Sequence, residues 1–364
     1  MRFPGFGGEW EREKLRDKCS FYSGGTPSSS NKSYYNGEIP FIRSGEISGD
    51  STELFLSEFG LNNSSAKMVD IGDLLLALYG ATSGQIAISK IRGAINQAIL
   101  CIKSSYDNIF LKSVWEKHVD KILQAYLQGG QGNLSADIVK NLSFYFPSLD
   151  EQNKISKLIV LIDERIETQN KIIEDLKKLK VAIRDKQLNT IRKHYGLNYQ
   201  ICDLLDYEQP TKYVVTDTEY SEDRSKTPVL TANKAFILGY TDESFGVYDK
   251  GACIILDDFT LDCKYVDFPF KVKSSAIKIL TVKNGCSLRY VYEYLNYMNL
   301  ETTEHKRHYI SEIEPMIIAY PTDKKGIDDF NNIMSSFESK IEIENKYLQS
   351  LLTQKVYLLS NMFI

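Results

Sequence analysis

Two long stretches of the chain place apolar residues at alternating steps of four and three, the spacing of a heptad seam along a helix. The first seam starts at Ile155 and the second at Phe330. Adding 175 to a seam position of the first stretch gives its counterpart in the second, and polar residues interrupt both seams at matching places. The pattern predicts two copies of one long helix, with a seam that includes Ile159, Ile162, Ile166, Ile173, Leu176, Lys180, Phe337, Ile341, Glu344, Leu348, Leu351 and Lys355.

The polar seam positions suggest how the two helices pair. A helix of about 40 residues rises roughly 60 Å, more than the width of one domain. If the helices pack antiparallel about a pseudo-two-fold axis, we expect Lys180 to face Glu344 and Gln169 to face Lys355. The alternative is that each amphipathic helix packs on its own domain alone.

The segments that precede the two helices also resemble each other. Ile39–Ile42 matches Thr227–Leu230, and Gln97–Ile99 matches Ser275–Ile277. Their apolar runs are short, rich in β-formers and bounded by turn formers. We therefore predict an α+β fold in which two β-rich domains are joined by two long helices that form an antiparallel coiled coil, with an internal pseudo-two-fold repeat. The predicted parts are residues 1–148 for the first domain, 149–194 for the first spacer helix, 195–322 for the second domain and 323–364 for the second spacer helix.

Composition narrows the class of protein. The 364 residues are 43% hydrophobic and 25% charged with a net charge of -4, which excludes a disordered or collagen-like chain. No window approaches the ~18 apolar residues of a membrane span, and the first ten residues lack the pattern of a signal peptide, so we expect a cytoplasmic protein. The six cysteines are scattered, which favours core thiols over a zinc site or a disulfide framework.

Several short motifs, taken in order, resemble a known family. They are the opening motif Arg2–Phe6 with Glu9–Glu11, then Ser23–Pro27, Ile39–Ile47, Gly72–Leu75, Tyr79–Gly84 and the stretch from Pro147 through Glu151 and Gln152. Together with the internal duplication, they resemble the specificity (S) subunit of Type I restriction-modification systems. The second half departs from the pattern in two ways. The segment 323–329 has no Glu-Gln pair, and we expect no loop in the second domain equivalent to Gly80–Gly84.

The resemblance implies a function. Each globular half would be a target recognition domain of a non-catalytic subunit that reads one part of a split sequence in double-stranded DNA. The expected partners are two modification subunits, which methylate adenine with S-adenosylmethionine, and restriction subunits that act as motor and nuclease. S-adenosylmethionine, ATP and Mg²⁺ are expected on those partners, and we expect neither a cofactor nor a metal on this chain.

Candidate base-reading residues lie on turns of the two domains. Arginine can pair with guanine and glutamine or asparagine with adenine, while lysine and backbone amides suit phosphate. Each of these residues could equally be an ordinary exposed turn residue. The candidates are Arg43, Ser44, Tyr79, Thr82, Ser83, Gln85, Gln131 and Asn133 in the first domain, and Asn233, Lys234, Lys264, His305, Lys306 and Arg307 in the second.

Other functions find less support. The chain has neither the Gly-rich cofactor loop and Asn-Pro-Pro-Tyr-type motif of a methyltransferase nor a Walker loop. Asp257, Asp258 and Asp262 with Lys264 could hold Mg²⁺ in a nuclease, but a surface loop explains them better. His305 and His308 have helical spacing without completing ligands for a metal. Two alternatives stay open: a coiled-coil adaptor that binds proteins rather than DNA, and an orphan specificity chain.

Overall fold

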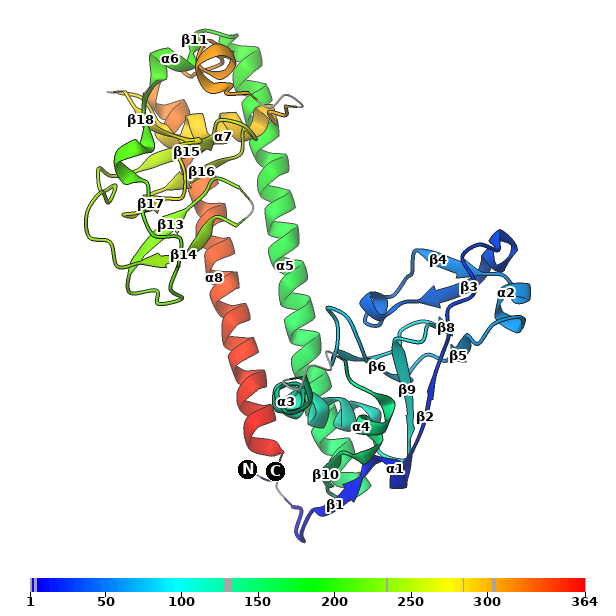
Figure 1. Ribbon diagram of the computed structural model, residues 1–364. Helices are drawn as coiled ribbons and strands as arrows, with labels where there is room; N and C mark the ends of the chain where they lie inside the picture. The colour runs from blue at the N-terminus through cyan, green and yellow to red at the C-terminus, as the bar shows by residue number, and fades with distance from the viewer. Residues whose placement is uncertain are drawn as a thin grey trace. The chain divides into compact units, whose positions relative to one another are not determined.

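The computed structural model describes residues 2, 5–127, 133–233, 235–283, 285–302 and 306–363 (Figure 1). The chain divides into two compact units. The first comprises Met1–Asn170 and Lys346–Ile364, and the second comprises Lys171–Asn345. Among the described residues, no helix combines the length and apolar character needed to cross a membrane.

The first unit is built on two small sheets and a two-stranded ribbon. One sheet is antiparallel in the order β2-β9-β6-β7, the other is mixed in the order β4-β3-β8-β5, and β1 pairs with β10. The strands are β1 (Glu11–Lys14), β2 (Cys19–Ser23), β3 (Tyr35–Ile42), β4 (Leu54–Leu56), β5 (Lys67–Val69), β6 (Leu74–Ala77), β7 (Ile86–Ile88), β8 (Gly93–Ile95), β9 (Ile99–Ser104) and β10 (Ser143–Phe146). The helices before the long spacer are α1 (Leu15–Lys18), η1 (Lys32–Tyr34), η2 (Ser44–Glu46), α2 (Glu58–Asn62), α3 (Asn108–Leu127) and α4 (Ala136–Asn141).

The second unit follows the same plan. Its sheets have the orders β12-β18-β15-β16 and β14-β13-β17, and β11 pairs with β19. The strands are β11 (Tyr199–Gln200), β12 (Leu205–Glu208), β13 (Thr227–Leu230), β14 (Ile237–Thr241), β15 (Cys253–Asp257), β16 (Cys263–Val266), β17 (Lys271–Val272), β18 (Ile277–Val282) and β19 (Ile317–Ile318). The helical segments are α6 (Ile201–Leu204), η3 (Pro210–Tyr213), α7 (Leu288–Met298) and η4 (Tyr309–Ile313).

The strand pairing confirms the internal repeat. In the first unit β3 runs parallel to β8 with Phe41 opposite Ala94, and in the second β13 runs parallel to β17 with Val229 opposite Lys271. These are the strands that the sequence comparison of Ile39–Ile42 with Thr227–Leu230 matched. The central strands β6 and β15 are buried at every residue, as expected for short apolar runs covered on both faces.

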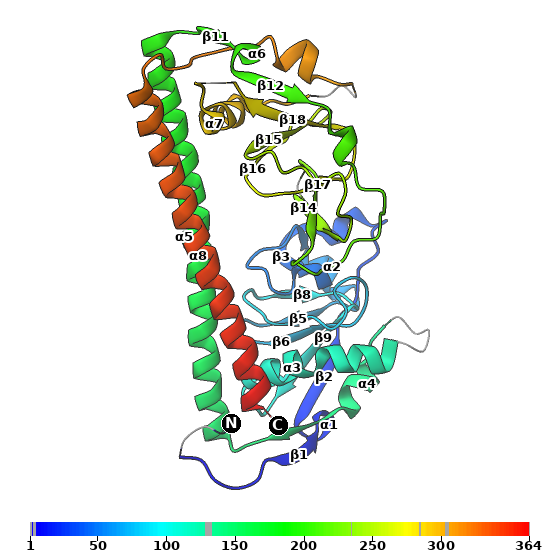
Figure 2. The same ribbon diagram turned by 90° about the vertical axis from the view of Figure 1, so that its left-hand side faces the viewer.

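Two long helices complete the fold, α5 (Leu149–Tyr195) with 47 residues and α8 (Lys324–Met362) with 39 (Figure 2). In the first unit, Lys355 Nζ lies 2.8 Å from Asp163 Oδ1, and the end of α8 reaches the core that contains Ile155. In the second unit, Lys180 Nζ lies 2.9 Å from Glu338 Oε1, and Leu188 shares a core with Phe330. Rising numbers on one helix meet falling numbers on the other, so the helices are antiparallel within each unit.

Both helices pack on each other and on the domain cores at once. The core of the first unit includes Ile155 and Ile159 of α5 together with Trp115 of α3. The core of the second unit includes Phe330 and Met334 of α8 together with residues of α7. The two packing modes that the sequence presented as alternatives are therefore combined. Among the seam residues, Ile159, Ile162, Ile173 and Leu351 are buried, and Ile166, Leu176, Lys180, Phe337, Ile341, Glu344, Leu348 and Lys355 are half-buried.

The expected pairing of polar seam residues is wrong by about one heptad. Lys180 meets Glu338 instead of Glu344, whose carboxylate pairs with Lys340 on its own helix. Lys355 meets Asp163 instead of Gln169, a buried residue. The expected pairing assumed that the two long helices contact only each other. In the structure, residues of the domain cores and acidic residues of α3 and α7 also contact the helices and select a different register.

Candidate nucleic-acid interface

The loop between β6 and β7 is held rigidly by the fold. Gly84 N donates to Ala77 O at 2.9 Å and Ser83 Oγ donates to Leu78 O at 2.9 Å. The indole N–H of Trp115, on α3, donates to Gly84 O at 2.8 Å. Gly84 has φ +86, and a Cβ there would lie 2.9 Å from a methyl group of Val119. Glycine is therefore required for this loop to approach α3 so closely.

Two of the motif loops meet at Gln97. Tyr79 Oη donates to the carbonyl oxygen of Gln97 at 2.6 Å, and Thr26 Oγ1 donates to its side-chain oxygen at 2.5 Å. The Ser23–Pro27 stretch and the β6–β7 loop therefore share an anchor. Gln85 is exposed, whereas Tyr79, Thr82 and Ser83 are half-buried. The fold brings these four candidates onto one short loop, which is a suitable scaffold for reading a groove.

Arg43 is engaged by carboxylates. Its guanidinium donates to Glu46 at 3.1 and 3.0 Å and to Glu53 at 2.5 Å. Partial burial alone would raise the pKa of Glu46, but hydrogen bonds from the Arg43 side chain and from the backbone N–H groups of Glu53 and Arg43 lower it to about 2. Ser44 begins the short helix η2 that carries Glu46. A base contact through Nε or Nη2 of Arg43 must therefore replace ion pairs within its own loop.

The second unit does contain a loop equivalent to Gly80–Gly84, contrary to the sequence-based expectation. It joins β15 to β16, the strands that correspond to β6 and β7. Leu261 has φ +63 where the first loop has Gly84 at +86. Asp257 Oδ1 accepts the N–H groups of Phe259 and Thr260, both at 2.9 Å, and closes the turn. No glycine motif marks this loop in the sequence, because a turn stabilised by an aspartate takes the place of the glycines.

Candidates of the second unit lie partly around this loop. Asn233 is exposed, and its side-chain oxygen accepts from Thr260 Oγ1 at 3.3 Å. Lys264 is half-buried on β16. Lys306 and Arg307 are exposed before η4, and Lys306 Nζ lies 2.9 Å from Glu312 Oε1. In the first unit Asn133 is exposed. The candidates Gln131, Lys234 and His305 lie outside the described residues.

The acidic residues considered for a nuclease have structural roles. Asp258 is buried, and its Oδ1 accepts the N–H groups of His308 and Tyr309 at 3.0 and 2.7 Å. Its other oxygen lies 3.4 Å from Lys278 Nζ, and both side chains are almost fully buried. His308 is buried with Nδ1 2.9 Å from Glu312 Oε2. Over the described residues, no group of three or more metal-ligating side chains comes together.

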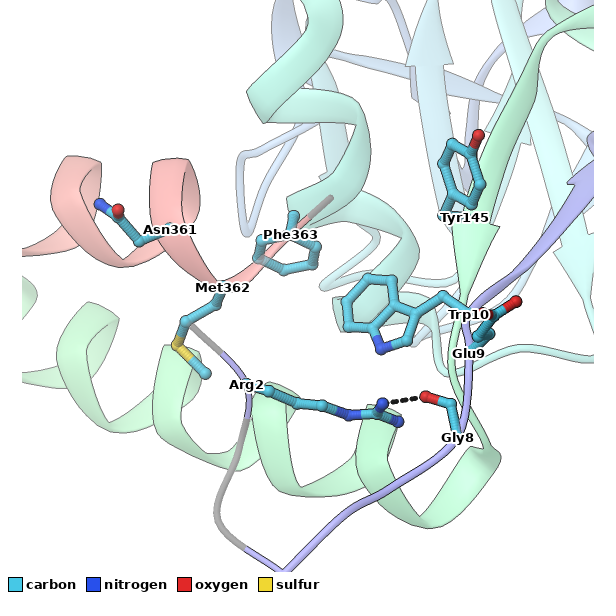
Figure 3. A pocket seen from close by; sticks show the side chains of 8 residues that line it. All are labelled: Arg2, Gly8, Glu9, Trp10, Tyr145, Asn361, Met362 and Phe363. Carbon is cyan, nitrogen blue, oxygen red and sulfur yellow. Dashed lines mark hydrogen bonds between the residues drawn. The ribbon is translucent and has the colours of Figure 1, made fainter.

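The residues of the opening motif line a cavity of about 540 Å³ in the first unit (Figure 3). Arg2 donates to Gly8 O and forms an ion pair with Glu151 at 2.8 Å. Trp10 packs edge-on against Phe363 with ring centroids 6.4 Å apart. Glu151, part of the Glu-Gln pair that begins α5, is 1% exposed at its side chain. These contacts tie the start of the chain to α5 and to the end of α8, so the motif has a structural explanation.

The arrangement defines a class of protein: a duplicated β-domain and helix, with loops on each domain that present polar side chains. Residues 7–178 match the family model described as Type I restriction modification DNA specificity domain. The chain is 48% identical over 125 residues to the EcoR124I/EcoR124II specificity subunit of Escherichia coli. This matched stretch covers 33% of this chain and 31% of that subunit. It is 24% identical over 298 residues to the MjaIX specificity subunit of Methanocaldococcus jannaschii, covering 77% of this chain and 67% of that one.

A solved structure shows the same fold over the whole chain. The S subunit of a Type I restriction-modification system from M. genitalium superposes with a TM-score of 0.61 at 14% identity, covering 100% of this chain and 99% of that one. The stronger sequence match spans about a third of the E. coli subunit's length. These similarities to Type I restriction-modification specificity subunits confirm the resemblance drawn from the motifs.

Proposed function

We propose that this chain is the DNA sequence-specificity subunit of a Type I restriction-modification complex and reads a target in two separated parts. The observation that carries this proposal is the duplicated domain-and-helix topology, together with the specificity-domain match over residues 7–178. A protein adaptor would not need two copies of a domain whose loops carry glutamine, asparagine and arginine. The adaptor alternative is therefore not favoured.

The proposal assigns chemistry to partner subunits. Two modification subunits would methylate adenine with S-adenosylmethionine, and restriction subunits would add the ATP-driven motor and the Mg²⁺-dependent nuclease. This chain would bind none of these cofactors and catalyse no step itself. Its contribution would be selection of the DNA site, in the cytoplasm where the DNA is.

Reading would use the loops of both domains. The β6–β7 loop, with Tyr79, Thr82, Ser83 and Gln85, would read one part of the target, supported by Asn133 and Gln131. The β15–β16 loop and Asn233 would read the other, with Lys234, Lys264, His305, Lys306 and Arg307 near phosphates. Arg43 and Ser44 would act after release from the carboxylates of their loop. Glutamine and asparagine suit adenine, and lysine suits the DNA backbone.

The long helices would set the unread gap between the two parts. The 47 residues of α5 correspond to about 70 Å and the 39 residues of α8 to about 58 Å at 1.5 Å per residue. Two reading surfaces act on the same face of DNA when they are about one helical turn apart, roughly 34 Å. Each helix is longer than this separation, so helix length would fix the distance between the two reading surfaces.

Methylome sequencing tests the proposal directly. Cells that carry the gene with its modification subunit should show a methylated adenine motif in two specific parts with a fixed gap. The motif should vanish when this gene alone is deleted and return on complementation. A methylome that does not change on deletion would contradict the proposed function.

A further inference from the structure

Two clusters of ionic side chains occupy equivalent places in the two units. We call them clamps. The first clamp consists of Lys112, Glu116, Asp163 and Lys355, and the second consists of Lys180, Arg289, Glu293 and Glu338.

The second clamp joins three helices of its unit. Lys180 Nζ, on α5, lies 2.6 Å from Glu293 Oε1 on α7 and 2.9 Å from Glu338 Oε1 on α8. Glu338 also accepts from Arg289, whose guanidinium stacks 4.6 Å from the ring of Tyr265. The side chain of Glu293 is only 2% exposed. Lys180 is thus shared between the partner spacer helix and the domain.

The first clamp repeats this arrangement. Lys355 Nζ, on α8, lies 2.8 Å from Asp163 Oδ1 on α5 and 3.8 Å from Glu116 Oε2 on α3. Lys112 Nζ lies 2.7 Å from the other oxygen of Glu116. The side chains of Lys355 and Glu116 are 20% and 27% exposed and that of Asp163 is 40% exposed, so the cluster is partly buried.

The correspondence extends to every member. Lys180 and Lys355, and also Asp163 and Glu338, differ by the 175 positions that relate the two seams. The remaining members differ by 177: Lys112 matches Arg289, and Glu116 matches Glu293. Each clamp has two cations and two carboxylates and is formally neutral. Charge at four matched places in each unit points to a common role beyond local solubility.

The role follows from a difference between apolar contacts and ion pairs in how well each fixes the register of two helices. An apolar heptad seam is repetitive, whereas an ion pair requires particular partners. A slide of one heptad would place Asn331 or Asn345 at the position of Glu338. The same slide would place Ser156 or Asn170 at the position of Asp163. All four replacements are neutral, so both lysines lose these partners when the register changes in either direction.

We propose that the two clamps fix the register of the spacer helices and the seating of each recognition domain on them, and that they thereby determine how strictly the subunit enforces the gap in its target. This inference rests on the proposed function. Ionic groups that are wholly or partly removed from water add little net stability but strong geometric selectivity in several systems, because a displaced partner leaves a charge without compensation. The clamps apply that selectivity where each domain meets the helix pair.

The test neutralises one clamp without leaving a lone charge. The variant carries Lys180→Met, Arg289→Gln, Glu293→Gln and Glu338→Gln. The control carries Lys178→Met and Glu174→Gln, which remove an exposed ion pair of 2.6 Å on the same helix. Each protein, assembled with its modification subunits, is titrated with duplexes that contain both target parts and gaps from two base pairs shorter to two longer than the native gap.

Wild type and control should prefer the native gap to the same degree. In the neutral variant the preference for the native gap over a one-base-pair change should fall about tenfold, equivalent to about 1.4 kcal/mol of coupling. A folded neutral variant with the wild-type gap preference would overturn the proposal. If it does not fold, the matching variant of the first clamp (Lys112→Met, Glu116→Gln, Asp163→Asn, Lys355→Met) carries the same expectation.

A variant in which the charges of the second clamp are reversed provides an independent test, because it keeps the ion pairs. Lys180→Glu, Arg289→Glu, Glu293→Lys and Glu338→Lys should restore the native gap preference, and a folded reversed protein with relaxed preference would refute a role for the ion pairs. A wild-type complex that ignores DNA sequence at every gap would instead contradict the proposed function, so the two failures are distinguishable.

Discussion

At the scale of residues, Arg43 is a candidate base-reading side chain that forms ion pairs within its own loop. Its guanidinium has the geometry to read guanine, yet it lies against Glu46 and Glu53. These contacts raise the pKa of Arg43, chiefly through the hydrogen bond to Glu46. A base contact through Nε or Nη2 of Arg43 therefore competes with two carboxylates.

The pKa of Glu46 gives a prediction for stability against pH. Because its pKa falls from 4.5 to about 2 on folding, its contribution is fully present above 4.5 and is lost as pH falls toward 2. Wild type should exceed Glu46→Gln in free energy of unfolding at pH 7, and the difference should shrink as pH falls below 4.5. Urea denaturation from pH 7 to pH 3 measures it, with the exposed Glu58→Gln as the control. A difference that grows on acidification would contradict this assignment.

Gly84 gives a second prediction at this scale. Gly80→Ala introduces a side chain at φ +80 with nothing within 4 Å, whereas Gly84→Ala introduces one at φ +86 that meets Val119 at 2.9 Å and Leu123 at 3.1 Å. We expect a loss of about 1 kcal/mol for the first and about 2–4 kcal/mol for the second, because crowding adds to strain. Thermal denaturation of the two variants separates the cost of backbone strain from the cost of crowding against α3. Equal losses would show that α3 yields to the new methyl group.

At the scale of elements, the long helices depend on a buried face. Ile159 is 1% exposed in the core of the first unit, while Leu161, two residues on, is 59% exposed. Ile159→Ala should lower the free energy of unfolding by about 2–5 kcal/mol, whereas Leu161→Ala should change it little. Denaturant titration of both variants checks the contrast. Similar losses in the two variants would mean that the seam is assigned to the wrong face.

The sequence predicted the elements better than their contacts. Heptad spacing located α5 and α8, and turn-bounded apolar runs such as Ile39–Ile42 and Thr227–Leu230 located the strands β3 and β13, because periodicity reflects burial directly. The pairing of Lys180 escaped prediction because Glu293, its partner on α7, belongs to a different element. The β15–β16 loop escaped because Asp257 supports a turn that glycines support in the first unit. Contacts between distant segments leave no local pattern to read.

At the scale of the whole molecule, DNA binding should carry an electrostatic signature despite a net charge of -4. Contacts from lysines to phosphates release counterions, so the logarithm of affinity should fall linearly with the logarithm of salt concentration. The assembled complex should bind its two-part duplex more weakly as salt rises, and Lys264→Gln should reduce the slope by about one if that residue contacts phosphate. A slope unchanged from wild type would remove Lys264 from the interface.

The most direct test of the account shortens both spacer helices by one heptad. Residues 171–177 of α5 and 341–347 of α8 are deleted together, which preserves the heptad phase and the pairing of both clamps. The loss is about 10.5 Å of helix, or about three base pairs at 3.4 Å each. Methylome sequencing of cells that express the shortened chain should show the same two specific parts with a gap about three base pairs shorter. An active shortened chain that methylates sites with the original gap would contradict the account.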